Sequence, residues 1–228
     1  MANLAFLGRG LNLCGWDPLQ EIAASKGHAC TVFERHEDIL GAFDLGVLLG
    51  YDHIVPEETL DLPEYGFVLF HSSDLPEGRG WAPLYNTIVG DLPLTQTLLY
   101  AAPEPDAGSL IAKARYDLRG DETEREVRRV DDALTLALLD GTLDDILAGE
   151  VEGVPQDGTK ATWWERRRPE DSAISVTDRI VDVFDHLRAL PASAPAFFEH
   201  RGRRFYLELT AEDEMQKPLG QFELERYY

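Results

Sequence analysis

The sequence predicts an α/β protein with a shortened N-terminal parallel sheet and a small C-terminal extension made of a helix and a β-hairpin. Three observations support this fold class. Short apolar runs alternate with helix-like segments in the first half of the chain, a long amphipathic helix follows, and two strand-like runs flank Arg201-Gly202 within residues 198–209. Alternation of buried strands with helices is typical of a parallel, doubly wound sheet.

The elements follow one another in short steps. Expected strands cover residues 3–8, 29–33, 46–50, 67–70, 94–101 and 110–118. Expected helices cover residues 17–26, 122–139, 142–148 and 177–189, with shorter helical segments at 56–63 and 84–89. Apolar residues at helical spacing, such as Val127, Val130 and Leu134, predict the long helix, and Gly141 is expected to separate it from the next one. The predicted organisation is a domain over 1–150, an extension over 151–210 and a tail over 211–228.

Charge is the most pronounced bulk property. The chain has 21 Lys and Arg residues against 42 Asp and Glu residues, a formal net charge of −21 and a pI near 4.5. Such a balance repels phosphates and argues against a nucleic-acid partner. It also resembles the acidic surface of proteins from salt-accumulating organisms, an interpretation that stability lost only above molar salt would contradict.

Other bulk features indicate a cytoplasmic protein. No apolar run is long enough to cross a membrane, and the N-terminus lacks the pattern of a signal peptide. Cys14 and Cys30 do not have the spacing of metal ligands, and no metal site is expected.

Residues 67–91 are the stretch around which the chemistry is expected. An apolar strand ends at His71, a loop rich in Ser, Asp, Pro and Gly follows, and a helical segment begins after Pro83. Open α/β sheets bind ligands beyond the carboxyl ends of their strands, and histidine exchanges protons near neutral pH. His71 is therefore the first candidate for a catalytic residue.

The stretch also resembles the central motif of the folate-dependent formyltransferases, H-x-S-x-L-P-x-x-R-G-x-x-P. The matching residues are His71, Ser73, Leu75, Pro76, Arg79, Gly80 and Pro83. Four further segments resemble this family in the same order: GYDHIVP, PDAGSL, RRRPEDSAI and PAFFEHRGRRFYLEL. The last two are similar to segments of the sugar-directed members. The ordered set covers roughly residues 45–210.

The resemblance implies a Rossmann-like formyltransferase fold and transfer of a formyl group from N10-formyltetrahydrofolate to an amine. The amine is expected to belong to an amino sugar linked to a nucleotide. The expected folate-binding residues are Gly50, Tyr51, Ile54 and Pro56. The expected substrate-binding residues are Arg79, Gly80 and Trp81. His71 is the expected catalytic residue, and family members place an Asn and an Asp beside it.

Two positions depart from that catalytic set. Leu69 stands where the family has Asn, and Ser109 stands where it has Asp. Asp106, in the same turn as Ser109, and Asp74, in the histidine loop, are the carboxylates that could replace the missing one. Three functions remain open: the formyltransferase, a formyltransferase-like protein that binds folate or a nucleotide sugar without turnover, and another one-carbon or acyl transferase.

Basic and aromatic residues suggest partners. The Arg166–Arg168 run either recognises the phosphates of a nucleotide-linked substrate or is a solvated segment balanced by acidic residues. Trp81 and Tyr85 either stack on a base or sugar or belong to the core. Aromatic residues within 197–228 make a homodimer plausible.

Overall fold

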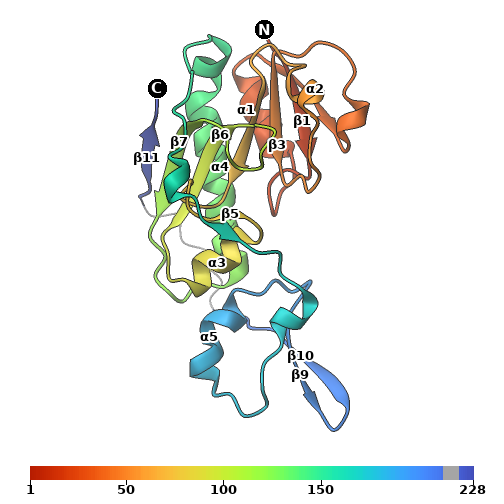
Figure 1. The fold of residues 1–228 in the computed structure, drawn as a ribbon, viewed down its shortest axis with the longest axis vertical. Coiled ribbons are helices and arrows are strands. Elements are labelled where there is room, and N and C mark those ends of the chain that lie inside the picture. The colour runs from red at the N-terminus through yellow and green to blue at the C-terminus, as the bar shows by residue number, and fades with distance from the viewer. Residues whose placement is uncertain (213–220) are drawn as a thin grey trace.

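A seven-stranded mixed sheet forms the centre of the molecule, as the computed structural model shows for residues 1–212 and 221–228 (Figure 1). Its order is β11-β7-β6-β4-β3-β1-β2, in which β2, β1, β3 and β4 are parallel and the later strands are antiparallel. The strands are β1 (Asn3–Gly8), β2 (Ala29–Phe33), β3 (Leu45–Leu49), β4 (Phe67–His71), β6 (Leu94–Tyr100), β7 (Leu110–Tyr116) and β11 (Glu223–Arg226). The predicted α/β class and the short parallel half are confirmed.

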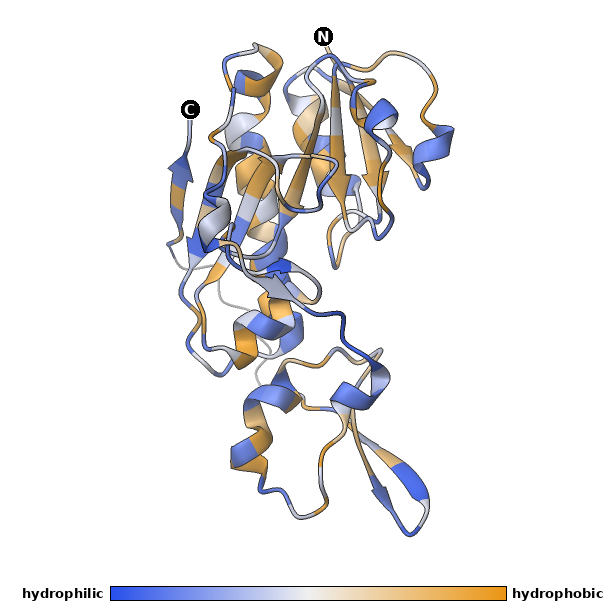
Figure 2. Ribbon diagram, in the orientation of Figure 1, coloured by the Kyte–Doolittle hydropathy of each residue, from blue (hydrophilic) through white to orange (hydrophobic). Residues whose placement is uncertain are grey.

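Two helices pack together on one face of this sheet. They are α1 (Asp17–Ser25) and α4 (Glu124–Leu147), and the shorter α2 (Glu57–Leu60) and α3 (Pro83–Val89) lie in the connections. Alternate residues of a strand face opposite sides. Phe6 and Val47 accordingly join the core under α1 and α4, whereas Leu7 and Leu48 join a second apolar cluster on the other face. Figure 2 shows apolar residues concentrated in these strands.

The C-terminal extension projects from the α/β body (Figure 1). It contains α5 (Ile180–Arg188) and a hairpin of β9 (Ala196–His200) and β10 (Arg203–Leu207), which turns at Arg201-Gly202 as expected. The connection to it forms a small sheet of its own, in which β5 (Arg79–Gly80) pairs with β8 (Trp163–Trp164). Short 3₁₀ helices cover His36–Asp38, Gly158–Lys160 and Pro169–Ser172.

The expected break in the long helix at Gly141 is wrong. α4 runs without interruption from Glu124 to Leu147, and buried residues on both sides of the glycine keep the helical spacing, among them Leu138 and Thr142. A glycine costs a helix only about 1 kcal/mol relative to alanine. Burial of the following turn against the sheet is worth more than that, so the helix continues.

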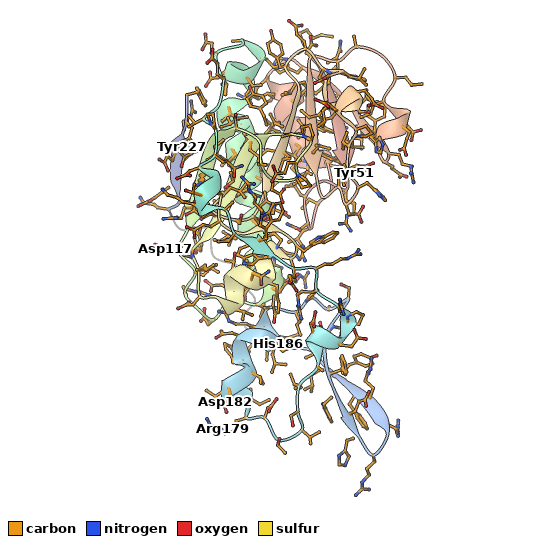
Figure 3. The ribbon with its side chains drawn as sticks, in the orientation of Figure 1. Tyr51, Asp117, Arg179, Asp182, His186 and Tyr227 are labelled. Atoms are coloured by element: carbon orange, nitrogen blue, oxygen red, sulfur yellow. The ribbon has the colours of Figure 1, made fainter. Side chains whose placement is uncertain are left out.

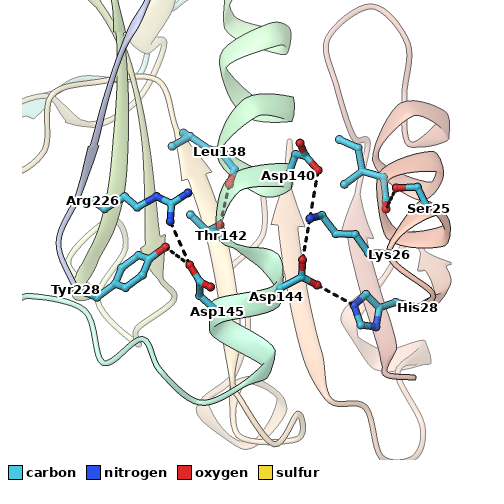
Figure 4. Close-up of polar contacts among 11 residues, drawn as sticks. Ser25, Lys26, His28, Leu138, Asp140, Thr142, Asp144, Asp145, Arg226 and Tyr228 are labelled. Carbon is cyan, nitrogen blue, oxygen red and sulfur yellow. Dashed lines mark hydrogen bonds and ion pairs between the residues drawn. The ribbon is translucent and has the colours of Figure 1, made fainter.

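The end of the chain, expected to be a loose tail or a strand that contacts a partner, contributes a strand to the central sheet. β11 pairs with β7 in antiparallel register at the edge of the sheet. Asp145 of α4 accepts hydrogen bonds from Arg226 and from the hydroxyl of Tyr228, while Lys26 forms ion pairs with Asp140 and Asp144 on the same helix (Figure 4). Polar contacts thus fix both the first helix and the last strand to α4. Residues 213–220 of the predicted tail lie outside the described residues.

None of the helices in the described ranges is long and apolar enough to cross a membrane.

Candidate active site

His71 is the last residue of β4, and its side chain is buried. Its Nε2 lies 2.8 Å from the carbonyl oxygen of Gly78, which can only accept a hydrogen bond, so Nε2 carries a proton. Its Nδ1 lies 3.5 Å from Oδ1 of Asp106. When Nδ1 is protonated as well, the ring is an imidazolium that faces a carboxylate.

Asp106 is held in place by the turn between β6 and β7. Its φ of +55° is a left-handed conformation that Asp adopts more readily than most residues. Its Oδ2 accepts a hydrogen bond of 2.9 Å from the backbone N–H of Gly80, and its carbonyl accepts one from Gln156. The structure therefore brings together the two residues that the sequence named as catalytic candidates.

The other candidate carboxylate, Asp74, has a different role. It forms ion pairs with Lys113 and Arg115 of β7, and Lys113 also donates to the carbonyl of Leu75. These contacts fasten the loop after His71 to the sheet. Leu69 packs against two apolar clusters and offers no hydrogen-bond donor. Of the two candidate carboxylates, Asp106 is the one that lies beside the imidazole.

The expected substrate-binding residues Arg79, Gly80 and Trp81 form part of the scaffold around Asp106. Arg79 is buried, and its guanidinium donates to Gln156 and pairs with Glu104. Gly80 has a φ of +99°, and a Cβ there would lie 2.6 Å from the carbonyl oxygen of Trp164. Trp81 is 44% exposed and lies under the guanidinium of Arg166. Of the three, Trp81 is the exposed one.

The expected folate-binding residues follow β3. The hydroxyl of Tyr51 lies 2.7 Å from Nδ1 of His36, and the carbonyl of Gly50 accepts a hydrogen bond from Arg9. Ile54 is 73% exposed, and Pro56 directly precedes α2. Figure 3 places Tyr51 on the N-terminal part of the molecule, away from His186 in the extension. This loop offers the apolar and aromatic surface that a flat heterocycle requires.

A cavity of about 670 Å³ lies between the α/β body and the extension. Ser72, the residue after His71, lines it, and so does the start of α3, whereas His71 and the expected binding residues do not. The extension contributes Arg167, Arg168 and Arg204. The chain thus has a cleft beside the histidine loop with a basic wall.

Aromatic rings support these arginines. The guanidinium of Arg167 lies 3.5 Å from the centre of the Tyr85 ring, and that of Arg204 lies 3.9 Å from the centre of the Phe197 ring. The Tyr85 hydroxyl in turn lies 2.8 Å from Nδ1 of His186. Burial lowers the pKa of His186. Within the described part of the chain, Arg166 and Arg168 form no ion pair. Both remain able to bind an anion.

Asp131 of α4 lines the same cavity from the body and was not anticipated. It is 4% exposed, its Oδ2 accepts a hydrogen bond from Asn12, and its Oδ1 has no hydrogen-bond partner among the described residues. Burial raises its pKa to about 6, although the nearby Ser72 hydroxyl and Asn12 oppose the rise. The sequence held a signal for it, because Asp131 falls on the apolar face defined by Val127 and Leu134.

Replacing Asp131 with asparagine is expected to raise the free energy of unfolding at pH 7 by about 3 kcal/mol, at about 1.4 kcal/mol per pKa unit. The folded chain holds the proton of Asp131 more tightly than the unfolded chain, so ionisation opposes folding above about pH 6. Below about pH 3 both states are protonated, and the difference should vanish. Urea unfolding at both pH values measures it, and an equal difference at the two values would contradict the prediction.

Curated proteins with similar sequences are methionyl-tRNA formyltransferases. The enzyme of Geobacillus sp. strain WCH70 is 32% identical over 163 residues, which cover 69% of this chain and 50% of that protein. The chain therefore spans about half the length of the curated relatives it matches. No protein-family model matches the chain.

Solved structures share the fold. A 4-N formyltransferase from Francisella tularensis has a TM-score of 0.79 at 17% identity, covering 93% of this chain and 98% of that chain. The formyltransferase PseJ from Anoxybacillus kamchatkensis, solved with UDP-4,6-dideoxy-4-formamido-L-AltNAc and tetrahydrofolate, has a TM-score of 0.62 at 19% identity, covering 71% of this chain and 85% of that chain. At these identities the similarity establishes the fold.

Proposed function

Because the chain belongs to the folate-dependent formyltransferase family, we propose that it moves a formyl group from N10-formyltetrahydrofolate to the amine of a nucleotide-linked amino sugar. The observation that carries the proposal is the His71–Asp106 pair at the end of β4. It lies next to a cavity large enough for a small molecule and lined by arginines.

The pair provides proton transfer and charge stabilisation. In the reaction a bond forms between the amine nitrogen and the formyl carbon, the bond from that carbon to N10 breaks, the amine loses a proton and N10 gains one. A tetrahedral oxyanion forms on the way and requires a hydrogen-bond donor. The positive charge of a His71 imidazolium, which Asp106 faces, stabilises this oxyanion electrostatically. Leu69 offers no amide at this point of β4, so His71 is the polar side chain that acts there.

The binding site for the formyl donor, N10-formyltetrahydrofolate, is assigned to the loop after β3. Exposed Ile54 and the ring of Tyr51 provide a surface for the pterin, and backbone groups around Gly50 and Pro56 provide hydrogen bonds to its polar edge. Trp81, which follows the histidine loop along the chain, offers a second exposed ring.

A nucleotide-linked sugar is favoured as the acceptor by the basic wall of the cavity. Guanidinium groups match the geometry of phosphate oxygens. The guanidinium of Arg168 forms no ion pair among the described residues, although the chain has a net charge of −21 and the Asp171 carboxylate accepts from the Arg168 backbone N–H. A tRNA acceptor, the substrate in the names of the curated relatives, would meet strong repulsion from the same net charge.

A second candidate function is binding of folate or a nucleotide sugar without turnover. Leu69 and Ser109 favour it, because both positions lack the polar side chains of the family's catalytic set. The position of Asp106 beside His71 favours the enzyme instead.

Release of tetrahydrofolate tests the two functions. The chain is incubated with N10-formyltetrahydrofolate and a panel of nucleotide-linked amino sugars, with initiator methionyl-tRNA as a comparison. Turnover with a sugar supports the proposal, and turnover with the tRNA alone rejects the sugar as acceptor. Folate binding without turnover on any acceptor supports the binding protein, and absence of folate binding rejects both.

Replacing Arg168 with alanine is expected to raise KM for the acceptor about 10- to 100-fold with little change in kcat, because a hydrogen bond to a charged group contributes about 1.5–3 kcal/mol. Steady-state kinetics with varied acceptor measures the change. Arg201→Ala, in the exposed turn of the hairpin, is the matched control and should leave KM unchanged. Equal effects of the two substitutions would show a general response to charge instead of a contact.

A further inference from the structure

The carboxyl group of Asp131 is an unusual feature of the cavity wall. It is almost fully buried, yet Oδ1 has no hydrogen-bond partner among the described residues. Asn12 donates to Oδ2 alone, and a buried polar atom left without a partner costs about 1–3 kcal/mol, so such an atom generally meets a ligand or a proton. The neighbouring cation, Arg128, is engaged by Glu124 and by the side-chain oxygen of Asn12.

The charges that line the cavity are divided between its two sides. The body contributes Asp131, Glu124 and Arg128, of which the last two form an ion pair. The extension contributes arginines and no carboxylate. A ligand that spans the cavity therefore meets one unpaired carboxylate near the histidine loop and positive charge at the other side.

We propose that Asp131 selects an acceptor with an amine, by accepting a hydrogen bond from that amine on Oδ1, while the arginines of the extension hold the acceptor's phosphates. This inference rests on the proposed function and assigns the residue that distinguishes an amino sugar from its hydroxyl counterpart. Ser72 lines the cavity next to Asp131 and directly follows His71, so an amine held there lies at the histidine loop. The ionised carboxylate at neutral pH suits a cationic partner.

Two other roles for Asp131 fit the structure less well. No group of three or more His, Cys, Asp or Glu side chains in the described ranges is placed to hold a metal ion. Fastening of the Asn12 loop is chiefly the task of Asp132, which accepts hydrogen bonds from the backbone N–H groups of Asn12 and Leu13. That task leaves Oδ1 of Asp131 unused.

Isothermal titration calorimetry with two sugars tests the inference. UDP-4-amino-4,6-dideoxyglucose and UDP-6-deoxyglucose differ in having an amine or a hydroxyl group at one carbon. We expect the unmodified chain to bind the amine at least about tenfold more tightly, which corresponds to about 1.4 kcal/mol. In Asp131→Asn this preference should fall to within about threefold, with the affinity for the hydroxyl sugar unchanged. Asp131→Ser provides a second variant if the first does not fold.

Asp132→Asn is the matched control, since it contacts the same loop and should keep the preference. The inference is overturned if Asp131→Asn keeps the preference, if Asp132→Asn loses it equally, or if the unmodified chain binds both sugars equally or neither. Release of tetrahydrofolate is followed on the same preparations. Turnover with an unchanged preference in Asp131→Asn rejects only this inference, whereas discrimination between the sugars without any turnover rejects only the proposed function.

Discussion

Replacing His71 with glutamine lowers kcat for formyl transfer about 10²- to 10⁴-fold, the contribution typical of a positioned acid or base. The glutamine amide can still donate to the Gly78 carbonyl, so the histidine loop keeps its main contact, but an amide cannot gain or lose the proton that the reaction moves. Tetrahydrofolate release under saturating donor and acceptor measures kcat, and donor affinity measured separately should remain within about threefold.

His200→Gln is the control for this change, because His200 is an exposed histidine at the end of β9 in the hairpin. Asp106→Asn completes the set: it keeps a side-chain oxygen for the N–H of Gly80 but removes the charge that faces Nδ1. We expect its kcat to fall in the same direction. Full activity of His71→Gln would show that the imidazole does not take part in the chemistry.

Much of this arrangement could be predicted because it depends on local pattern. Apolar runs place β1, β3 and β4, and the motif around His71 identifies the loop that leaves the sheet. This chain has Ser109 where the family has Asp, which pointed to Asp106 in the same turn as the replacement. Asp106 does lie beside the imidazole. The strands followed from the pattern along the chain, whereas the histidine loop and Asp106 followed from the resemblance to the formyltransferase family.

The remainder depends on contacts between distant segments, which spacing does not reveal. Arg79 matched the motif but is buried against Gln156, a residue 77 positions away. β11 reaches β7 from the far end of the chain, and Asp131 is buried because Asn12 and the extension cover it. A glycine such as Gly141 indicates a helix end locally, yet packing of α4 on the sheet decides otherwise.

The turn that carries Asp106 predicts the largest loss of stability near the site. Gly108→Ala would place a Cβ 1.8 Å from the carbonyl oxygen of Tyr100, which belongs to the backbone of β6 and cannot move alone. Overpacking of this kind costs about 1–3 kcal/mol, and the rigid backbone neighbour favours the upper value, so at about 2–4 °C per kcal/mol we expect a fall in Tm of roughly 6–12 °C for a cost of about 3 kcal/mol. Thermal unfolding followed by circular dichroism measures it.

In Gly108→Ala, kcat should also fall, even at temperatures well below the Tm, where the variant is fully folded. Relief of the clash must move the 106–109 turn. The carbonyls of Asp106 and Gly108 both accept hydrogen bonds from Gln156, so we expect the turn to move as a unit and to draw Asp106 away from His71. Gly158→Ala is the matched control, since a Cβ there meets nothing within 4 Å. Loss of Tm with unchanged kcat in Gly108→Ala would separate the turn from the chemistry, and Asp106 would then have no role in orienting the imidazole.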